Sequence, residues 1–102
     1  MQLDQTANGK IVSVKPNDEF DLSLPETRTA GYRWSLKSNP EACKLLEETT
    51  EPNAKPGGEG RHHWRFRAAV LGECEIELHY ARPWENASEP AKTFRMRVQI
   101  QP

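Results

Sequence analysis

The sequence lacks the features that mark membrane proteins and has few of those that mark disulfide-rich proteins. Its longest uninterrupted hydrophobic run covers residues 68–71, far below the roughly 20 apolar residues that a membrane-spanning helix needs. It contains only two cysteines, Cys43 and Cys74, which allow one disulfide or two reduced thiols, and their spacing does not decide between them. Strand phase points both side chains inward, where a free cysteine behaves as a small hydrophobic residue, so buried free thiols are the preferred expectation.

An excess of charge of either sign is also lacking. The chain has 14 Lys and Arg against 15 Asp and Glu, a formal net charge of -1, so we expect no binding surface for nucleic acid or for a membrane. Its 102 residues suffice for one domain with one core, spanning residues 1–102, and we expect a monomer. Met1 leads directly into polar residues without an export signal, so we expect a cytoplasmic protein, or one from which such a signal has been removed.

Motifs that carry metal or hydrolytic chemistry are missing too. No CxxC or HExxH pattern occurs, and His62 and His63 are neighbours on an expected strand, so their side chains point to opposite faces. His63 and His79 could share an ion only if their strands paired directly. No G-x-S-x-G elbow or P-loop is present, and a chain of this size has little room for a cleft between paired carboxylates. We therefore expect no metal, no cofactor and no enzymatic activity.

The sequence does show repeated alternation of apolar and polar residues, which is typical of half-buried strands. Polar residues such as Arg65, Glu75 and Arg97 occupy the intervening positions. An opening strand at residues 11–14 brings the expected number to about seven, separated by Pro, Gly, Asn and Ser clusters, which predicts an all-β antiparallel sandwich or barrel. The apolar columns are Phe20, Leu22 and Leu24; Tyr32, Trp34 and Leu36; Trp64, Phe66 and Ala68; Cys74, Ile76, Leu78 and Tyr80; and Phe94, Met96, Val98 and Ile100.

Two local features have more than one interpretation. Residues 39–48 begin with Asn-Pro and contain helix formers, so they fit either a helical turn or an irregular edge strand. Near Gly72, the short gap between two apolar columns fits a hairpin, in which Arg65 would face Glu77. It fits equally a corner, in which the two columns belong to different sheets and face each other across the core.

Three loops contain residues that contribute little to folding. They cover residues 24–34, 56–64 and 80–90, and in an up-and-down sandwich the connections that hold them emerge at the same end. Tyr32, Trp34 and Trp64 are expected in the core. Trp84 is expected to be exposed, because Pro83 breaks the strand ladder just before it. Exposed Trp and Arg are enriched at binding hot spots, so we expect this end to bind a partner.

These loops resemble the three motifs of the chagasin family, which are inhibitors of papain-like cysteine peptidases. The family pattern R-P-W/F matches residues 82–84 in full, and a G-x-G-G-like turn matches residues 57–60 except that Glu59 replaces a glycine. The pattern N-P-T-T-G-Y/F aligns with residues 27–32. The resemblance implies an immunoglobulin-like antiparallel β-sandwich of about seven or eight strands, with a corner at Gly72. It assigns peptidase binding to Thr27, Arg28, Thr29, Ala30, Gly31, Tyr32, Gly57, Gly58, Glu59, Gly60, Arg82, Pro83 and Trp84.

The first of these motifs departs most from the family pattern. Thr27 and Arg28 stand in place of Asn and Pro, and Ala30 in place of the second Thr, so we expect a loop that is less rigid or is shaped for a different peptidase. The resemblance implies that residues 28–31 enter the active-site cleft as a wedge, with Thr29 nearest the catalytic cysteine. The other two motifs would lie along the two walls of the cleft and give reversible, competitive inhibition without a cofactor.

Two other functional hypotheses keep the same fold. In one, Trp84 stacks on a sugar face, helped by Arg82 and His79, and the chain is a carbohydrate-binding module. In the other, the edge around Trp84 is a generic interaction surface for a different kind of protein. Inhibition of a cysteine peptidase would distinguish the chagasin-like hypothesis from both.

Overall fold

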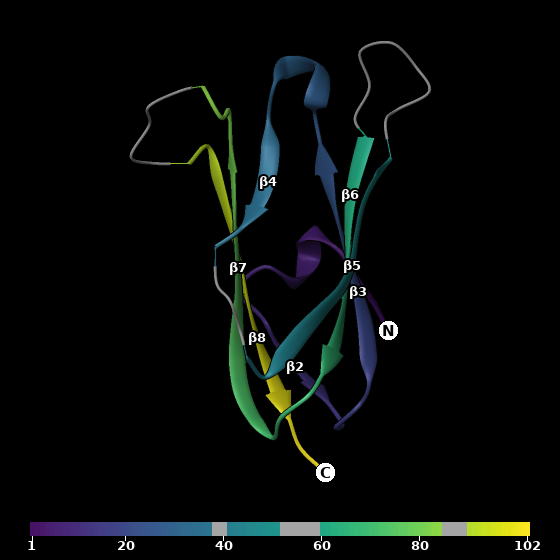
Figure 1. Ribbon diagram of the computed structural model, residues 1–102. Coiled ribbons are helices and arrows are strands. Elements are labelled where there is room, and N and C mark those ends of the chain that lie inside the picture. The colour runs from purple at the N-terminus through teal and green to yellow at the C-terminus, as the bar shows by residue number, and fades with distance from the viewer. Residues whose placement is uncertain (38–40, 52–59, 85–89) are drawn as a thin grey trace.

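The structure is a computed structural model that describes residues 1–37, 41–51, 60–84 and 90–102. The described residues form eight strands in two four-stranded sheets that face each other as a sandwich (Figure 1). Two 3₁₀ helices, η1 (Gln5–Ala7) and η2 (Arg28–Ala30), lie in the connections, and no helix of the described chain is long and apolar enough to cross a membrane. The first sheet has the order β1 (Gln2–Leu3), β3 (Glu19–Glu26), β6 (Gly60–Ala68), β5 (Cys43–Glu51), and the second has the order β2 (Ile11–Val14), β8 (Lys92–Ile100), β7 (Gly72–Ala81), β4 (Arg33–Leu36).

The apolar columns line the space between the two sheets, which confirms the predicted all-β sandwich. Strands β3, β6, β7 and β8 contribute every second side chain to this core because strand side chains alternate between faces, whereas β5 contributes only Cys43. Full burial of a large apolar side chain contributes about 1.5–3 kcal/mol. Trp34 and Trp64 are buried as predicted, whereas Tyr32, Leu36 and Cys74 are only partly buried against the core. The buried residues are Ala7, Val14, Phe20, Leu22, Leu24, Trp34, Cys43, Trp64, Phe66, Ala68, Ile76, Leu78, Tyr80, Phe94, Met96, Val98 and Ile100.

The sheets are mixed rather than purely antiparallel, which corrects one part of the prediction. β1 pairs with β3 in parallel and β2 pairs with β8 in parallel, each at the edge of its sheet, while the other pairings are antiparallel. The first strands lie in different sheets because η1 turns the chain between them. Asp4 caps η1 by accepting a hydrogen bond from the backbone N–H of Thr6 at 2.9 Å. Apolar periodicity does not report strand direction, so the sequence could not reveal this.

Strand β5 settles the interpretation of residues 39–48 for the part that the structure describes. It is an edge strand that begins at Cys43 and pairs with β6, so the helical alternative is wrong there, while Asn39 and Pro40 lie outside the described residues. Its register shifts between Leu45 and Glu47, which makes it irregular as well. Helix propensity is a weak preference, and the hydrogen-bonding edge of β6 overrides it.

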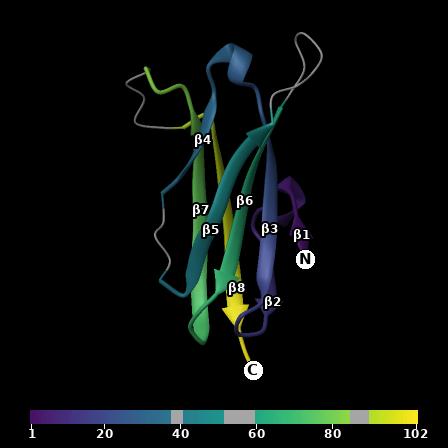
Figure 2. The same ribbon diagram turned by 45° about the vertical axis from the view of Figure 1, so that its right-hand side comes forward.

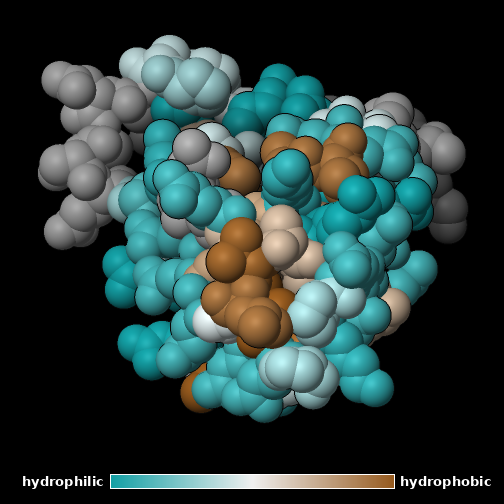
Figure 3. All heavy atoms as spheres, turned by 60° about the horizontal axis from the view of Figure 1, so that its bottom comes forward, coloured by the Kyte–Doolittle hydropathy of each residue, from teal (hydrophilic) through white to brown (hydrophobic). Residues whose placement is uncertain are grey.

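The connection at Gly72 is a corner between the sheets and not a hairpin. β6 pairs with β3 and β5, whereas β7 pairs with β4 and β8, so Arg65 and Glu77 lie in different sheets. Gly72 has φ 124°, a conformation that favours glycine. Val70 and Leu71 in this connection are each 56% exposed. Figure 3 views this end of the molecule and shows hydrophobic side chains at the surface among hydrophilic ones.

Candidate functional site

The strand ends that carry the three motifs lie at the end of the sandwich opposite Gly72. In the first sheet, Glu26 at the end of β3 pairs with Gly60 at the start of β6. In the second sheet, Arg33 at the start of β4 pairs with Ala81 at the end of β7. Figure 2 shows η2 at this end, above the strands. The connections β3–β4, β5–β6 and β7–β8 therefore start and finish beside one another, as strand counting predicts.

Only part of the glycine motif can be placed. Gly60 is the first residue of β6 and is partly buried. Gly57, Gly58 and Glu59 lie outside the described residues.

The central connection, residues 27–32, is a compact turn tied to the opposite sheet. The backbone N–H of Thr27 donates to the hydroxyl of Tyr80, which lies 2.7 Å away on β7. The turn η2 closes when the N–H of Gly31 donates to the carbonyl of Arg28 at 2.9 Å, with Gly31 left-handed at φ 89°. Tyr32 then stacks on the ring of Tyr80 with centroids 5.0 Å apart. The departures from the family pattern thus leave a turn that is fixed at both ends.

The R-P-W segment packs directly on this central turn. Arg82 donates from Nε to the carbonyl of Ala30 at 3.0 Å, and its guanidinium lies 4.5 Å from the ring centroid of Tyr32. Trp84 is 69% exposed, as predicted, yet the six-membered ring of its indole lies against Gly31. A Cβ at Gly31 would lie 1.9 Å from Cη2 of Trp84, so only glycine fits there. The first and third motifs form one interlocked surface, which we call the loop edge (residues 27–32 and 82–84).

A buried carboxylate supports the loop edge from below. Glu26 is 1% exposed and accepts hydrogen bonds from the Trp34 backbone N–H at 2.8 Å, Arg28 Nε at 2.5 Å and His62 Nδ1 at 2.8 Å. Burial by itself would raise the pKa of Glu26, but the hydrogen bonds from His62, Trp34 and Arg28 together outweigh it and hold that pKa below 4.5. Glu26 belongs to the first sheet and Trp34 to the second, so the carboxylate joins the sheets where the loop leaves them.

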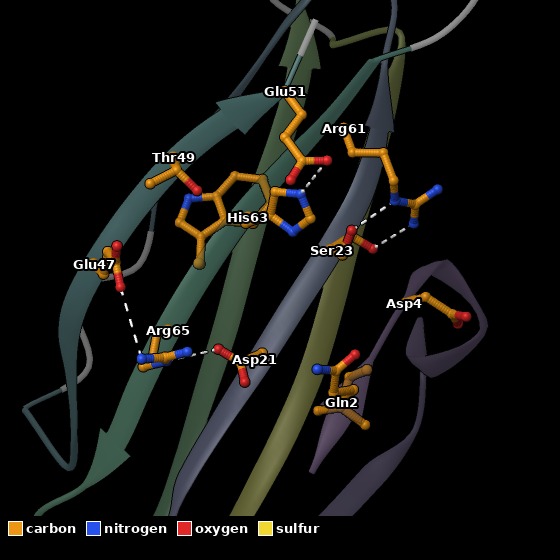
Figure 4. Close-up of a pocket in the computed structure, with 12 residues that line it drawn as sticks. Gln2, Asp4, Asp21, Ser23, Glu47, Thr49, Glu51, Arg61, His63 and Arg65 are labelled. Atoms are coloured by element: carbon orange, nitrogen blue, oxygen red, sulfur yellow. Dashed lines mark hydrogen bonds and ion pairs between the residues drawn. The ribbon is translucent and has the colours of Figure 1, made fainter. Parts of the chain in front are cut away.

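A polar hollow of about 530 Å³ lies on the outer face of the first sheet, away from the loop edge (Figure 4). Its charged side chains contact each other: Arg65 lies 2.9 Å from Asp21 and 3.8 Å from Glu47. Arg61 donates from Nε to Ser23 Oγ at 2.6 Å. In the described ranges, no cluster of three or more His, Cys, Asp or Glu could hold a metal ion. The hollow is lined by four carboxylates and two arginines, and its described residues hold no metal-ligand set.

Residues 13–98 match the chagasin family, described as peptidase inhibitor family I42. The chain belongs to the chagasin family of peptidase inhibitors. Among its relatives, it is 25% identical over 88 residues to Amoebiasin-2 of Entamoeba histolytica, a match that covers 82% of this chain and 72% of that protein. The family consists of inhibitors, not enzymes.

Solved structures of similar proteins share the sandwich. The cysteine protease inhibitor EhICP2 from Entamoeba histolytica gives a TM-score of 0.88 at 22% identity, covering 98% of this chain and 94% of that one. Amebosin gives a TM-score of 0.80 at 25% identity, and the match covers 99% of this chain and 97% of that one. PbICP-C, solved in complex with falcipain-2, gives a TM-score of 0.74 at 16% identity, and the match covers 92% of this chain and 91% of that one. The chagasin-like fold of this chain is therefore shown over almost its whole length.

Sequence reasoning missed three groups that shape this chagasin-family loop edge: the carboxylate of Glu26, the imidazole of His62 and the hydroxyl of Tyr80. A signal was present for the first two. Glu26 continues the inward column of Leu24, and His62 precedes Trp64 in the inward phase of β6. An ionisable residue in an apolar column is costly unless it has partners, so its position points to a buried network. For Tyr80 the sequence indicated a core ring but gave no partner for its hydroxyl.

Proposed function

We propose that this chagasin-family chain inhibits papain-like cysteine peptidases reversibly and competitively, without a cofactor, by inserting the loop edge into the active-site cleft. The observation that carries the proposal is the interlocking of the first and third motifs, with Arg82 bonded to Ala30 and Trp84 packed on Gly31. Family membership supports it, as do the names of two structural relatives, a cysteine protease inhibitor and a protein solved with falcipain-2.

The shape of the central turn explains why a peptidase would bind it without cleaving it. Cleavage requires a peptide bond held in line with the nucleophile at about 3–3.5 Å. Residues 28–30 instead form the turn η2, whose backbone is curled and closed by the bond from Gly31 to Arg28. In the proposal, Thr29 at the middle of η2 comes nearest the catalytic cysteine. The curled backbone offers no extended peptide bond for attack.

The flanking motifs would hold the wedge in place. Trp84 presents a largely exposed, rigid indole, which is well suited to a hot-spot contact with one wall of the cleft. In the proposal, Gly57, Gly58, Glu59 and Gly60 lie along the other wall. Arg82 braces the central turn from within the loop edge, so the turn loses little conformational freedom on docking. An interface of standard size, about 1,600 Å² in total, then suffices for tight binding.

The test is a steady-state assay of papain and of a cathepsin L-like peptidase against increasing amounts of the purified chain, with chymotrypsin as the control enzyme. We expect loss of both cysteine peptidase activities, relieved by substrate, and no effect on chymotrypsin. Thr29→Arg is expected to abolish inhibition because it enlarges the tip of the wedge. Leu71→Arg adds the same side chain at the exposed opposite end and should inhibit as the unmodified chain does.

Each outcome bears on a different part of the proposal. Absence of inhibition at micromolar concentrations would refute the inhibitor function and favour a binding module that uses Trp84. Inhibition that is unchanged by Thr29→Arg would keep the function and refute the wedge. Cleavage of the chain between residues 27 and 32 during the assay, seen by mass spectrometry, would refute the explanation from the curled turn.

A further inference from the structure

Four ionisable side chains form a continuous bridge beneath the central turn. Arg28 of η2 contacts Glu26 of β3 at 2.5 Å, and Glu26 lies 2.8 Å from Nδ1 of His62 on β6. The other ring nitrogen of His62, Nε2, lies 2.7 Å from Glu48 on β5. We call this set the Glu26 bridge (Arg28, Glu26, His62 and Glu48). It links the turn to β3, then to β6 and then to β5, which are neighbours in the first sheet.

The bridge is complete only when His62 carries a proton on each ring nitrogen. A neutral imidazole donates from one nitrogen and accepts at the other, whereas an ionised carboxylate only accepts. With both nitrogens protonated, the charges of His62 and Arg28 balance those of Glu26 and Glu48. Two uncharged contacts belong to the described part of this site: the indole of Trp64 stacks on the imidazole with centroids 4.1 Å apart, and the backbone N–H of Trp34 on β4 donates to Glu26.

We propose that Glu26 is the positioning residue of the inhibitory turn and that its hold on the turn depends on the second proton of His62. The inference rests on the proposed inhibitor function. Glu26 accepts from Arg28 inside the turn and from the Trp34 N–H just after it, so the one carboxylate fixes both the turn and its exit strand. Loss of the second proton leaves a ring lone pair facing one of the carboxylates, which weakens the bridge at the buried pair of His62 and Glu26.

The consequence is a pH dependence that belongs to the inhibitor and not to its target. The turn should be held more firmly at acid pH, where the second proton of the ring is favoured, and its dissociation from a peptidase should be slower there. Because the peptidase titrates as well, the quantity to compare is the ratio of the inhibition constants of a variant and of the unmodified chain on the same enzyme.

Glu26→Gln is the decisive variant because it keeps the size of the side chain and removes its charge. We expect its inhibition constant to exceed that of the unmodified chain by roughly tenfold or more near pH 5.5, and the ratio to narrow near pH 8. Glu77→Gln is the matched control, since Glu77 also contacts a histidine and an arginine, His79 and Arg95, but lies on the outer face of β7. The ratio of the inhibition constant of Glu77→Gln to that of the unmodified chain should stay near one at both pH values.

A second variant and a second measurement keep the inference testable if Glu26→Gln does not fold. Glu48→Gln removes the charge at the partly exposed end of the bridge. It should reduce the pH dependence of inhibition and should weaken inhibition less than Glu26→Gln does. Nuclear magnetic resonance titration of the unmodified chain needs no peptidase. The backbone amide of Trp34 and the Nε–H of Arg28 should shift in step with the ring nitrogens of His62, and Glu48→Gln should weaken this link.

These measurements separate failure of the inference from failure of the proposed function. Linked shifts in a chain that inhibits no peptidase would keep the bridge as a pH-sensitive clamp and refute only its role in inhibition. A folded Glu26→Gln with an unchanged inhibition constant would refute the positioning role. Amide shifts at Trp34 that are independent of His62 would refute the pH dependence.

The two cysteines carry a second inference, which does not depend on the inhibitor function. Cys43 at the start of β5 and Cys74 on β7 belong to different sheets, and their Sγ atoms lie 2.8 Å apart as free thiols. A disulfide bond is about 2.05 Å long, so the sulfurs need to approach by only about 0.8 Å to reach bonding distance. Cys74 is only partly buried and lines a surface hollow together with Glu73, Glu75 and Arg97.

We infer that Cys43 and Cys74 form a reversible cross-sheet disulfide under oxidising conditions. A hydrogen bond from the Cys43 thiol lowers the pKa of Cys74, and that same bond together with burial raises the pKa of Cys43, so Cys74 is the first nucleophile. Its thiolate attacks one sulfur of oxidised glutathione and releases one glutathione thiolate. Cys43 then loses its proton, attacks Cys74 Sγ and displaces the second. Two protein thiols are thereby oxidised, and one glutathione disulfide is reduced to two thiols.

Oxidised glutathione under native conditions tests this inference directly. We expect the intact mass to fall by about 2 Da, both free thiols to disappear in a thiol assay, and the melting temperature to rise by roughly 10 °C. Inhibition should not change, because Cys43 and Cys74 lie near the ends of their strands farthest from the loop edge. Cys43→Ser should instead yield a stable glutathione adduct on Cys74. Retention of both thiols, or an adduct on the unmodified chain that does not resolve, would overturn the inference.

Discussion

The hydroxyl of Tyr80 on β7 lies 2.7 Å from the backbone nitrogen of Thr27, so a strand of one sheet supports the start of the loop that leaves the other. Tyr80→Phe removes this acceptor and leaves the Thr27 N–H without it. We expect the free energy of unfolding to fall by about 1–2 kcal/mol, because a partly buried donor loses its partner. Inhibition should weaken as well, since the central turn loses its first anchor. Urea unfolding and the peptidase assay give the two values.

Tyr32→Phe is the matched control for Tyr80→Phe. Tyr32 stacks on the same ring, but among the described residues its hydroxyl makes no hydrogen bond. Its removal should change the free energy of unfolding by less than about 0.5 kcal/mol. Equal losses in the two variants would show that the Tyr80 hydroxyl is not an anchor.

Gly31 is held both by its backbone conformation and by the indole above it. Gly31→Ala should cost about 1–2 kcal/mol for the left-handed conformation and a further amount for the overlap with Trp84. Gly9→Ala isolates the first effect, because Gly9 is also left-handed at φ 78° but has no atom within 4 Å of its Cβ position. Unfolding curves of both variants should show the larger loss for Gly31→Ala. In the double variant Gly31→Ala/Trp84→Ala, the additional loss of stability caused by the overlap with the indole should disappear. If that additional loss persists, the packing explanation is refuted.

Glu77, in the second sheet, should make the free energy of unfolding depend on pH. A hydrogen bond from His79 at 2.6 Å, together with the charge of Arg95, lowers the pKa of Glu77 below 4.5. A carboxyl whose pKa is lowered by folding contributes its full stability above pH 4.5 and loses it as the pH falls through the lower folded value. Glu77→Gln should therefore flatten part of the acid limb of a plot of unfolding free energy against pH. An acid limb that is the same in Glu77→Gln as in the unmodified chain would refute this explanation.

Much of the architecture could be predicted because burial in a sandwich imposes a period of two. The columns around Phe20, Trp64 and Ile76 are buried as their spacing indicates, and the three connections at one end follow from counting strands. Strand direction at the edges could not be predicted, because β1 and β2 would show the same alternation in either direction. Whether residues 43–48 form a helix or a strand also depended on pairing with β6, which alternation within the segment itself does not reveal.

The loop edge could be located from the sequence, but its internal contacts could not. The motifs at residues 27–32 and 82–84 indicated which residues come together, and the exposed state of Trp84 followed from Pro83. The bond from Arg82 to Ala30 and the indole over Gly31 depend on the relative position of two loops, about which alternation carries no information. The roles of the individual residues in binding a peptidase stay predictions until variants are measured.

Trp84 provides the clearest separation between binding and stability. It is 69% exposed, so Trp84→Ala should change the free energy of unfolding by less than about 1 kcal/mol. If the indole is a hot spot, the same variant should raise the inhibition constant for papain by roughly 30- to 1,000-fold, the range expected for truncating a central interface aromatic. Trp84→Phe should keep part of the affinity, because it retains a rigid apolar ring. Leu71→Ala, which removes an exposed apolar side chain at the opposite end, controls for loss of surface hydrophobicity. A Trp84→Ala variant that inhibits as well as Leu71→Ala would place the binding surface elsewhere, because no other described aromatic side chain is exposed at the loop edge to this degree.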